Sequence, residues 1–341
     1  MKAALVYEVK KPLRVMDVAT PAITPDELLI RIHASGICYS DLHALDGAIP
    51  YGKLPIVPGH EGAGVVEVVG ANVRDFSIGD RVVLRFVMTC GACLPCFQGR
   101  DNLCTRVKFL GFDTDGTFSE YVAINSRHAI KLPKTITLEE GAILGCAVVT
   151  PLHAMNIANV TPGSTVAIFG LGGVGIHAVQ MARIFGASDI FAIDVAETKL
   201  DLSKSLGATT IINSLKEDPV SRIKETTDGF GVDYAFEFVG LPTTQLQGIK
   251  SVRRGGTVVI VGIPRQSPDI DLGYLLANEI QLRTSFDHTR AEIDNVIRLM
   301  ESGRLDLTKS ISHKFSLDKV NEGIEVLTKK IGDPVRVILV S

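Results

Sequence analysis

The segment TVAIFGLGGVGIHAVQMA, residues 165–182, decides how this chain folds. An apolar run of strand type passes directly into GLGGVG and then into a stretch with helical spacing. Gly170, Gly172 and Gly175 permit a tight turn, a close approach of the backbone to a pyrophosphate, and close packing of helix on strand. Gly173 and Val174 complete the turn, and amides at the helix N-terminus would face the phosphate charge. The segment predicts a dinucleotide-binding unit.

Asp194 ends the next apolar run, FAID, at about the spacing of 20 residues expected for an acid that binds the adenosine ribose. A 2′-phosphate beside this carboxylate would be repelled by on the order of 4 kcal/mol at about 4 Å and an effective dielectric of about 20. We therefore expect NAD rather than NADP. A helix N-cap, in a capping box with Glu197, is the alternative role, and the two roles can coexist.

Short apolar runs alternate with helix-compatible segments from Ser164 onward. Strands separated by helices of about 10–15 residues predict right-handed βαβ units and a parallel sheet. We expect an α/β fold with a doubly wound sheet in this half. After residues 165–170, the expected strands are DIFAID, TTIIN, VDYAFEFVG and TVVIVGI, at residues 189–194, 209–213, 232–240 and 257–263.

The first 150 residues or so are predicted to form a β-rich domain. Their apolar runs are separated by Gly, Pro, Asn and Asp, with few long helical periods. The tail from about Asp287 adds two predicted helices, at 291–303 and 317–330, and a last strand at 335–340. The N-terminal runs are ELLIRIHAS, GAGVVEVVG, DRVVLRF and EYVAI, at residues 27–35, 62–70, 80–86 and 120–124.

Composition excludes several classes of protein. The chain has 341 residues, 35 Lys and Arg against 38 Asp and Glu, and a mean hydropathy of +0.25, so we expect a globular protein without a nucleic acid partner. No charged residue occurs between Gly141 and Ala182, but Pro151 and Pro162 interrupt the stretch before about 20 apolar residues accumulate, so no membrane span is predicted. The N-terminus lacks the pattern of a secretory signal, which favours the cytoplasm.

The six cysteines divide into a group of four and a separate pair. Cys90, Cys93, Cys96 and Cys104 lie within CGACLPCFQGRDNLC, close enough for four thiolates to bind one ion. Disulfides are improbable in a cytoplasmic chain. The last gap and the missing Cys-Pro ending fit neither common iron–sulfur spacing. The spacing therefore predicts a structural zinc site with no open position.

The other two cysteines, Cys38 and Cys146, lie near residues that are able to complete a second site. Cys38 opens CYSDLH, and His60 and Glu61 follow in the turn PGHEGAG. Taken singly, a lone cysteine is usually a small buried apolar residue, and a lone histidine is more often structural. The presence of these cysteines together with His60 and Glu61 favours a functional site over such structural roles.

Together these elements resemble the zinc-dependent alcohol dehydrogenases of the medium-chain dehydrogenase/reductase superfamily over essentially the whole chain. The resemblance implies a discontinuous GroES-like catalytic domain, residues 1–147 and 287–341, around an inserted Rossmann NAD-binding domain, residues 148–286. The implied reaction is hydride transfer between a primary or secondary alcohol and NAD, giving an aldehyde or ketone. The resemblance rests on the order of GICYSDLH, LPIVPGHEGAGVVE, the four-cysteine group, GCAVVT, GLGGVG with its Asp, and PVRVILV.

The resemblance also implies a catalytic zinc, the second of two zinc ions per chain. Cys38, His60 and Cys146 would be its protein ligands, an arrangement known from alcohol dehydrogenase. Glu61 matches the family carboxylate that approaches the metal during ligand exchange. Asp41 matches the acid that orients the ligating histidine through its other ring nitrogen.

In the family, zinc acts as a Lewis acid that stabilises the alkoxide form of the substrate. Ser40 would accept the hydroxyl proton, which in the family passes through the nicotinamide ribose to a surface histidine, here matched by His43. An ordinary polar turn is the alternative role for both residues. Phe86 matches an aromatic wall of the substrate pocket.

Further cofactor contacts are implied only by position. Lys199 would reach the adenosine ribose and Arg336 the pyrophosphate, although a solvated helix and a surface strand are their alternative roles. Tyr39 departs from the family where some members carry a basic phosphate-contacting residue, so the resemblance implies no basic pyrophosphate contact at this position. The remaining positions, which are otherwise core residues, would contact the nicotinamide: Thr150, Val174, Val239, Val261 and Ile263.

The fold and the set of zinc ligands do not by themselves distinguish an alcohol dehydrogenase from polyol or threonine dehydrogenases of the same superfamily. Zinc-free quinone or enoyl reductases are disfavoured by the complete ligand set. A non-catalytic NAD-binding protein is disfavoured because Ser40, His43 and the ligands are all present. The resemblance also implies a homo-oligomer, with a tetramer favoured over a dimer.

Overall fold

The computed structural model describes residues 1–340. The chain forms two compact units: Met1–Val149 with the tail from Asp287, and Thr150–Phe286. The chain crosses between the units after Val149 and after Phe286, and the domain boundaries expected from the resemblance are after Ala147 and after Phe286. No turn marks this first crossing, because a buried π-helical turn, η3 (Leu144–Val148), continues directly into helix α4 (Val149–Ala158).

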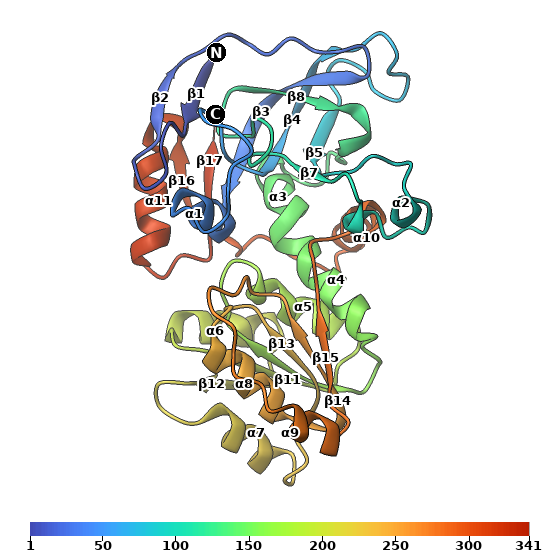
Figure 1. The fold of residues 1–341 in the computed structure, drawn as a ribbon, viewed down its shortest axis with the longest axis vertical. Helices are drawn as coiled ribbons and strands as arrows, with labels where there is room; N and C mark the ends of the chain where they lie inside the picture. Colours follow the sequence, from blue (N-terminus) through green and yellow to red (C-terminus); the bar gives the residue numbers. More distant parts are fainter. Residues whose placement is uncertain (341) are drawn as a thin grey trace. The chain divides into compact units, whose positions relative to one another are not determined.

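A seven-stranded sheet is the frame of the first unit (Figure 1). Its order is β16-β17-β3-β4-β5-β9, and β8 also pairs with β3. The tail strand β17 pairs with β3, so the two ends of the chain build one sheet. The strands of this sheet are β3 (Glu27–Ile37), β4 (Glu61–Val69), β5 (Arg81–Leu84), β8 (Tyr121–Asn125), β9 (Ala129–Lys131), β16 (Ile311–Ser316) and β17 (Arg336–Val340).

Two small sheets and several helices complete this unit. Strands β1 (Lys2–Leu5) and β2 (Arg14–Asp17) form one antiparallel pair, and β6 (Val87–Met88) and β7 (Lys108–Phe109) form the other. The predicted tail helices are confirmed as α10 and α11. The helices are α1 (Tyr39–Leu45), α2 (Leu94–Phe97), η1 (Asp101–Leu103), η2 (Ser126–His128), α3 (Leu138–Ile143), α10 (Arg290–Glu301), η4 (Leu317–Lys319) and α11 (Val320–Lys329).

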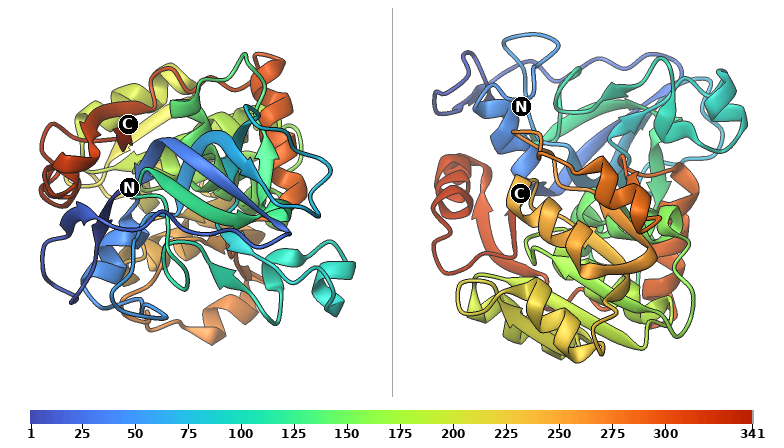
Figure 2. Two further views of the ribbon diagram at one scale, coloured as in Figure 1. Left: turned by 90° about the horizontal axis from the view of Figure 1, so that it is seen from above. Right: turned by 60° about the horizontal axis from the view of Figure 1, so that its bottom comes forward.

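A six-stranded, entirely parallel sheet forms the second unit (Figures 1 and 2). The order β12-β11-β10-β13-β14-β15 places the two halves of the sheet on either side of the boundary between β10 and β13, where doubly wound folds bind ligands. The predicted fold class is therefore confirmed. The strands are β10 (Thr165–Phe169), β11 (Asp189–Asp194), β12 (Thr210–Asn213), β13 (Val232–Glu237), β14 (Val252–Ile260) and β15 (Gln281–Thr284).

Helices connect these strands, as the alternating pattern predicts. α5 (Gly175–Ile184) follows the glycine-rich turn, and α6 (Glu197–Leu206) follows Asp194. β15 and the short helix before it, α9, were not predicted, because neither has a clear apolar period. The remaining helices are α7 (Pro219–Thr226), α8 (Pro242–Ser251) and α9 (Leu272–Ala277).

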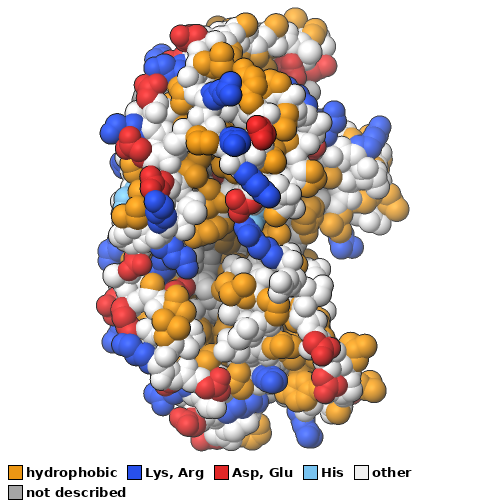
Figure 3. Space-filling model, turned by 60° about the vertical axis from the view of Figure 1, so that its left-hand side comes forward, with side chains coloured by type: hydrophobic (Ala, Val, Ile, Leu, Met, Phe, Trp, Pro, Cys, Tyr) orange, Lys and Arg blue, Asp and Glu red, His pale blue; other side chains and the backbone are white. Residues whose placement is uncertain are grey.

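One helical stretch, Leu138–Ala158, has the length and hydropathy of a membrane-spanning helix. However, 83% of its most apolar window is buried inside the protein, as in the core helix of a globular fold. On the face drawn in Figure 3, basic and acidic side chains are interspersed, without a continuous basic surface.

Candidate metal centres and cofactor site

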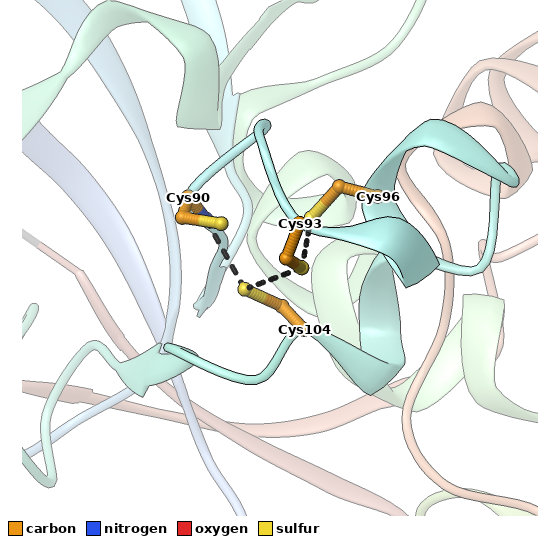
Figure 4. A group of neighbouring side chains, drawn as sticks. All are labelled: Cys90, Cys93, Cys96 and Cys104. Atoms are coloured by element: carbon orange, nitrogen blue, oxygen red, sulfur yellow. Dashed lines mark hydrogen bonds between the residues drawn. The ribbon is translucent and has the colours of Figure 1, made fainter.

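The four cysteines of the segment from Cys90 to Cys104 point toward one another (Figure 4). Zinc at about 2.3 Å from four tetrahedrally placed sulfurs would hold them about 3.8 Å apart. The Sγ atoms of Cys93 and Cys104 are 3.8 Å apart, and those of Cys93 and Cys96 are 3.4 Å apart. These distances exclude disulfides, and all four thiols are free. The residues fit a structural zinc ion.

Backbone amide groups and the Arg106 guanidinium surround these sulfurs. The backbone amide of Ala92 donates to Cys90 Sγ, and the amides of Cys90 and Arg106 donate to Cys104 Sγ. The Ala92 amide is the main cause that lowers the pKa of Cys90 to about 6. Donors of this kind favour thiolates, the form in which cysteine binds a metal.

A second group of ligand atoms lies within the first unit. Single atoms of Cys38, His60, Glu61 and Cys146 all lie within 4.8 Å of one another, and all four residues are buried. Three separate elements supply them: Cys38 caps α1, His60 and Glu61 stand at the start of β4, and Cys146 lies in the π-helical turn η3. Such turns frequently occur at functional sites. Folding thus brings the expected catalytic ligands together.

Asp41 holds two of these ligands in place. Its Oδ1 lies 2.9 Å from His60 Nδ1, and its Oδ2 accepts a hydrogen bond of 2.8 Å from the Cys38 amide. Since a carboxylate only accepts, we assign the proton to Nδ1, which leaves Nε2 as the metal-binding nitrogen. The structure therefore gives Asp41 the orienting position that the resemblance implies.

The ligands influence one another's protonation. Hydrogen bonding from Cys146 lowers the pKa of Cys38 well below its ordinary value, while the same contact, together with burial, raises the pKa of Cys146. Burial alone would lower the pKa of His60, but Asp41 and Cys38 raise it well above its usual value. Groups that share protons in this way exchange them for a cation when a metal binds. Two sulfurs, an imidazole and a carboxylate suit zinc.

Glu61 forms a buried ion pair with Arg336 of β17. Burial raises the pKa of Glu61 to about 7, although the Arg336 guanidinium opposes this. Gly36 leaves room for the carboxylate, because a Cβ there would lie 1.9 Å from Glu61 Oε2. Arg336 is therefore buried beside the metal ligands rather than on a strand surface. Its Nε has no hydrogen-bond partner among the described residues, so its pyrophosphate contact stays a prediction.

Ser40 and His43 lie three residues apart on α1 and therefore share a face of that helix. The Ser40 hydroxyl is 3.8 Å from Cys38 Sγ, next to the predicted metal position. Tyr39 donates its hydroxyl hydrogen bond to the Leu327 carbonyl. Phe86 contacts the His60 ring at 4.8 Å between centroids, so an aromatic wall borders the ligand group.

The glycine-rich turn of the second unit has the geometry that a dinucleotide site requires. Gly170 has φ +90°, which favours glycine, and a Cβ on Gly175 would lie 1.9 Å from the Gly170 carbonyl oxygen. At Gly172, no atom lies within 4 Å of the Cβ position, so that face of the turn is open to a ligand. These features fit the three roles predicted for the glycines.

Asp194 is fixed beside this turn by backbone amides. Its carboxylate accepts hydrogen bonds from Leu171 at 2.6 Å, from Val195 at 2.8 Å and from Ala196 at 3.0 Å. The capping-box alternative is wrong, because α6 begins after Ala196 and has no side-chain cap. Glu197 instead binds Asn213 and Lys216. Lys199 lies half-buried in the first turn of α6.

The predicted nicotinamide contacts lie at or beyond the ends of their elements. Val239 and Ile263 follow β13 and β14, and their side chains are 42% and 45% exposed. Val261 directly follows β14, Val174 precedes α5, and Thr150 lies in the first turn of α4. Exposed apolar side chains at the carboxyl ends of parallel strands suit a ligand-covered surface.

Glu237 belongs to this edge of the sheet and was missed from the sequence. It is fully buried at the end of β13 and accepts hydrogen bonds from the amides of Val239 and Gly240 and from the Thr244 hydroxyl. Burial raises its pKa above the ordinary value. Its only signal was an acid inside the apolar run VDYAFEFVG.

Comparison with known proteins identifies the family of this chain. Residues 24–134 match the family described as "Alcohol dehydrogenase GroES-like domain", and residues 173–302 match "Zinc-binding dehydrogenase". An alcohol dehydrogenase from Geobacillus stearothermophilus is 36% identical over 332 residues, covering 96% of each chain. A sorbitol dehydrogenase from Bacillus subtilis is 36% identical over 330 residues, covering 95% of this chain and 93% of the relative.

A solved zinc-binding dehydrogenase from Sinorhizobium meliloti, bound to NADP, superposes with a TM-score of 0.93 at 31% identity, covering 100% of this chain and 99% of that one. Fold, ligand group and relatives therefore agree. The chain belongs to the zinc-dependent alcohol dehydrogenases of the medium-chain dehydrogenase/reductase superfamily.

Proposed function

We propose that this dehydrogenase uses NAD to interconvert a primary or secondary alcohol with its aldehyde or ketone at a zinc ion held by Cys38, His60 and Cys146. The observation that carries the proposal is the convergence of these three side chains, with Glu61, within 4.8 Å in a buried group. When bound, zinc supplies a Lewis acid and NAD supplies a hydride acceptor.

The chain's own residues supply binding, orientation and proton transfer. Asp41 keeps the His60 ring turned so that Nε2 faces the ligand group. Ser40 Oγ accepts the substrate hydroxyl proton while it gives up its own, and His43, on the same face of α1, passes the released proton to solvent. Phe86 presents an apolar wall, and Glu61, balanced by Arg336, is the spare carboxylate beside the metal.

Asp194 is the reason for proposing NAD rather than NADP. The three backbone amides that it binds hold a negative charge close to the open face of the glycine-rich turn. A 2′-phosphate would meet this charge, at a cost on the order of 4 kcal/mol for about 4 Å and an effective dielectric of about 20. The adenosine ribose hydroxyls, in contrast, donate hydrogen bonds to the Asp194 carboxylate. Lys199, in the first turn of α6, is the proposed second ribose contact.

The test is alcohol-dependent NADH formation by protein of known metal content. Wild-type enzyme is expected to contain close to two zinc ions per chain and to reduce NAD+ with alcohols. Cys146→Ala is expected to keep the structural zinc and lose activity. Full activity in Cys146→Ala, or in wild-type protein freed of all metal, would contradict the proposal.

A polyol is the second candidate substrate, because the sorbitol dehydrogenase is as similar to this chain as the alcohol dehydrogenase is. Parallel assays with monohydric alcohols, polyols and hydroxy amino acids separate the two. The apolar wall formed by Phe86 favours the monohydric alcohols. A higher kcat/KM for sorbitol than for every monohydric alcohol would decide for the polyol.

We also propose that the enzyme is a homo-oligomer, with a tetramer favoured over a dimer. β15 is an edge strand, and Leu272 and Leu276 on the preceding helix α9 are 73% and 81% exposed. An open edge beside exposed leucines favours pairing with a second copy. Light scattering after gel filtration would measure the mass, and Leu276→Glu is expected to lower it.

The six free cysteines suit a reducing compartment, so the cytoplasm is the proposed location.

A further inference from the structure

His177 lies two residues inside α5, beneath the glycine-rich turn, and its side chain is fully buried. Its Nδ1 atom is 3.0 Å from the carbonyl oxygen of Gly173. A carbonyl oxygen only accepts hydrogen bonds, so Nδ1 carries the proton and donates it. No sequence motif points to this residue.

The Gly173 carbonyl accepts its hydrogen bond from the His177 side chain instead of from the backbone amide of the same residue. The Ile176 amide binds the Gly172 carbonyl at 3.1 Å, whereas the His177 amide binds the Val174 carbonyl, also at 3.1 Å. The amide that would close a regular helical turn on Gly173 is therefore used elsewhere. The imidazole makes that missing hydrogen bond.

Fixing this carbonyl also fixes the next amide. In a trans peptide unit the C=O of Gly173 and the N–H of Val174 point in opposite directions. Because the carbonyl is held on the helix side by His177, the Val174 N–H faces out of the N-terminal end of α5. The open Cβ position of Gly172 lies in the same turn. That is the end of the helix where an anion is stabilised.

Glycine makes such a restraint valuable. Gly173 has no Cβ to limit its backbone angles, so without the imidazole the Gly173–Val174 peptide unit would be free to adopt several orientations. A turn that is already ordered binds its ligand without losing that freedom. We propose that His177 is a positioning residue for the cofactor, which holds the Gly173–Val174 peptide with its amide directed at the dinucleotide pyrophosphate. This inference rests on the proposed NAD site.

The test compares ligands with and without the pyrophosphate, measured by calorimetry or ligand NMR on the full-length zinc-loaded protein. His177→Leu removes the donor at similar volume. The hydrogen bond it loses favours the ordered turn by a factor of about ten, and this factor is the largest loss of affinity that disordering the turn causes. We expect binding of NAD+ and ADP-ribose to weaken by up to about tenfold and binding of adenosine to stay unchanged. His177→Asn is the matched control, because its side-chain amide donates from nearly the position of Nδ1, and it is expected to recover most of the affinity.

Equal losses for adenosine and ADP-ribose would show a merely structural role and overturn the proposal, as would unchanged binding in His177→Leu. A second readout on the wild type does not depend on a variant that folds. Nitrogen NMR of the His177 ring is expected to show a protonated Nδ1, and a ring protonated only at Nε2 overturns the proposal. Wild-type protein that binds none of these ligands would instead refute the proposed NAD site.

Discussion

Asp41→Asn is the change that most sharply separates the two metal sites. The carboxylate makes two hydrogen bonds, at 2.9 Å to His60 Nδ1 and at 2.8 Å with the Cys38 amide. Asparagine keeps one acceptor, but its NH₂ group would face a donor at the other contact. Hydrogen bonds to charged groups contribute about 1.5–3 kcal/mol, which corresponds to about 10–100-fold in affinity. Loss of a partner that orients a metal ligand typically costs a similar factor.

The assay is zinc retention against graded concentrations of a chelator, followed by metal analysis. We expect one of two zinc ions to be removed at about 10–100-fold lower chelator concentration in Asp41→Asn than in the wild type, while the zinc of the four-cysteine site is unaffected. Asp201→Asn, which removes an exposed carboxylate on α6, is the matched control and is expected to retain both ions. Unchanged retention in Asp41→Asn, or equal loosening of both ions, would refute this reasoning.

Three further predictions concern the relay, the cofactor and acid stability. His43→Ala is expected to slow alcohol oxidation most at low pH and to recover with added buffer base; an unchanged pH profile of kcat would remove His43 from the relay. Asp194→Asn is expected to raise kcat/KM for NADP+ relative to NAD+ by about 100-fold. This factor is smaller than the full repulsion would give, because the carboxylate is partly exposed. An unchanged ratio would argue against the Asp194 charge as the determinant of cofactor choice. Burial lowers the pKa of His128 to about 3, and the charges of Arg85, Arg127 and Arg290 add to this effect. As the pH falls below 6.5, His128 is therefore protonated in the unfolded state but stays neutral in the folded state. Wild-type stability should then fall by about 2–3 kcal/mol more than that of His128→Leu between pH 6.5 and 4.5 in urea unfolding, and parallel losses would contradict this assignment.

Local patterns were enough to predict the geometry of the glycine-rich turn and the grouping of the four cysteines. In both cases the interacting groups lie close together in the sequence, so spacing alone limits their geometry. Asp194 was placed correctly at the end of β11, but its capping role was misread. The spacing to Glu197 fits a capping box, whereas the carboxylate binds Leu171, whose amide reaches it only after β10 and β11 pair.

The proposed catalytic ligands were inferred from the resemblance rather than from spacing. Cys38, His60 and Cys146 lie on elements that the fold alone brings together, and no local period links them. The pairing of Arg336 with Glu61 was out of reach for the same reason, because the two residues are 275 positions apart and meet through the tail strand β17. His177 was missed because its partner is a backbone carbonyl, which leaves no pattern in the sequence.

Anomalous X-ray scattering at the zinc absorption edge, from crystals of the wild-type enzyme, tests the central claim most directly. Two peaks are predicted in each chain, one among the four cysteines and one bonded to Cys38 Sγ, His60 Nε2 and Cys146 Sγ, with distances of about 2.3 Å to sulfur and about 2.0–2.1 Å to nitrogen. A crystal of active enzyme with zinc among the four cysteines and no peak bonded to these three side chains would contradict the account.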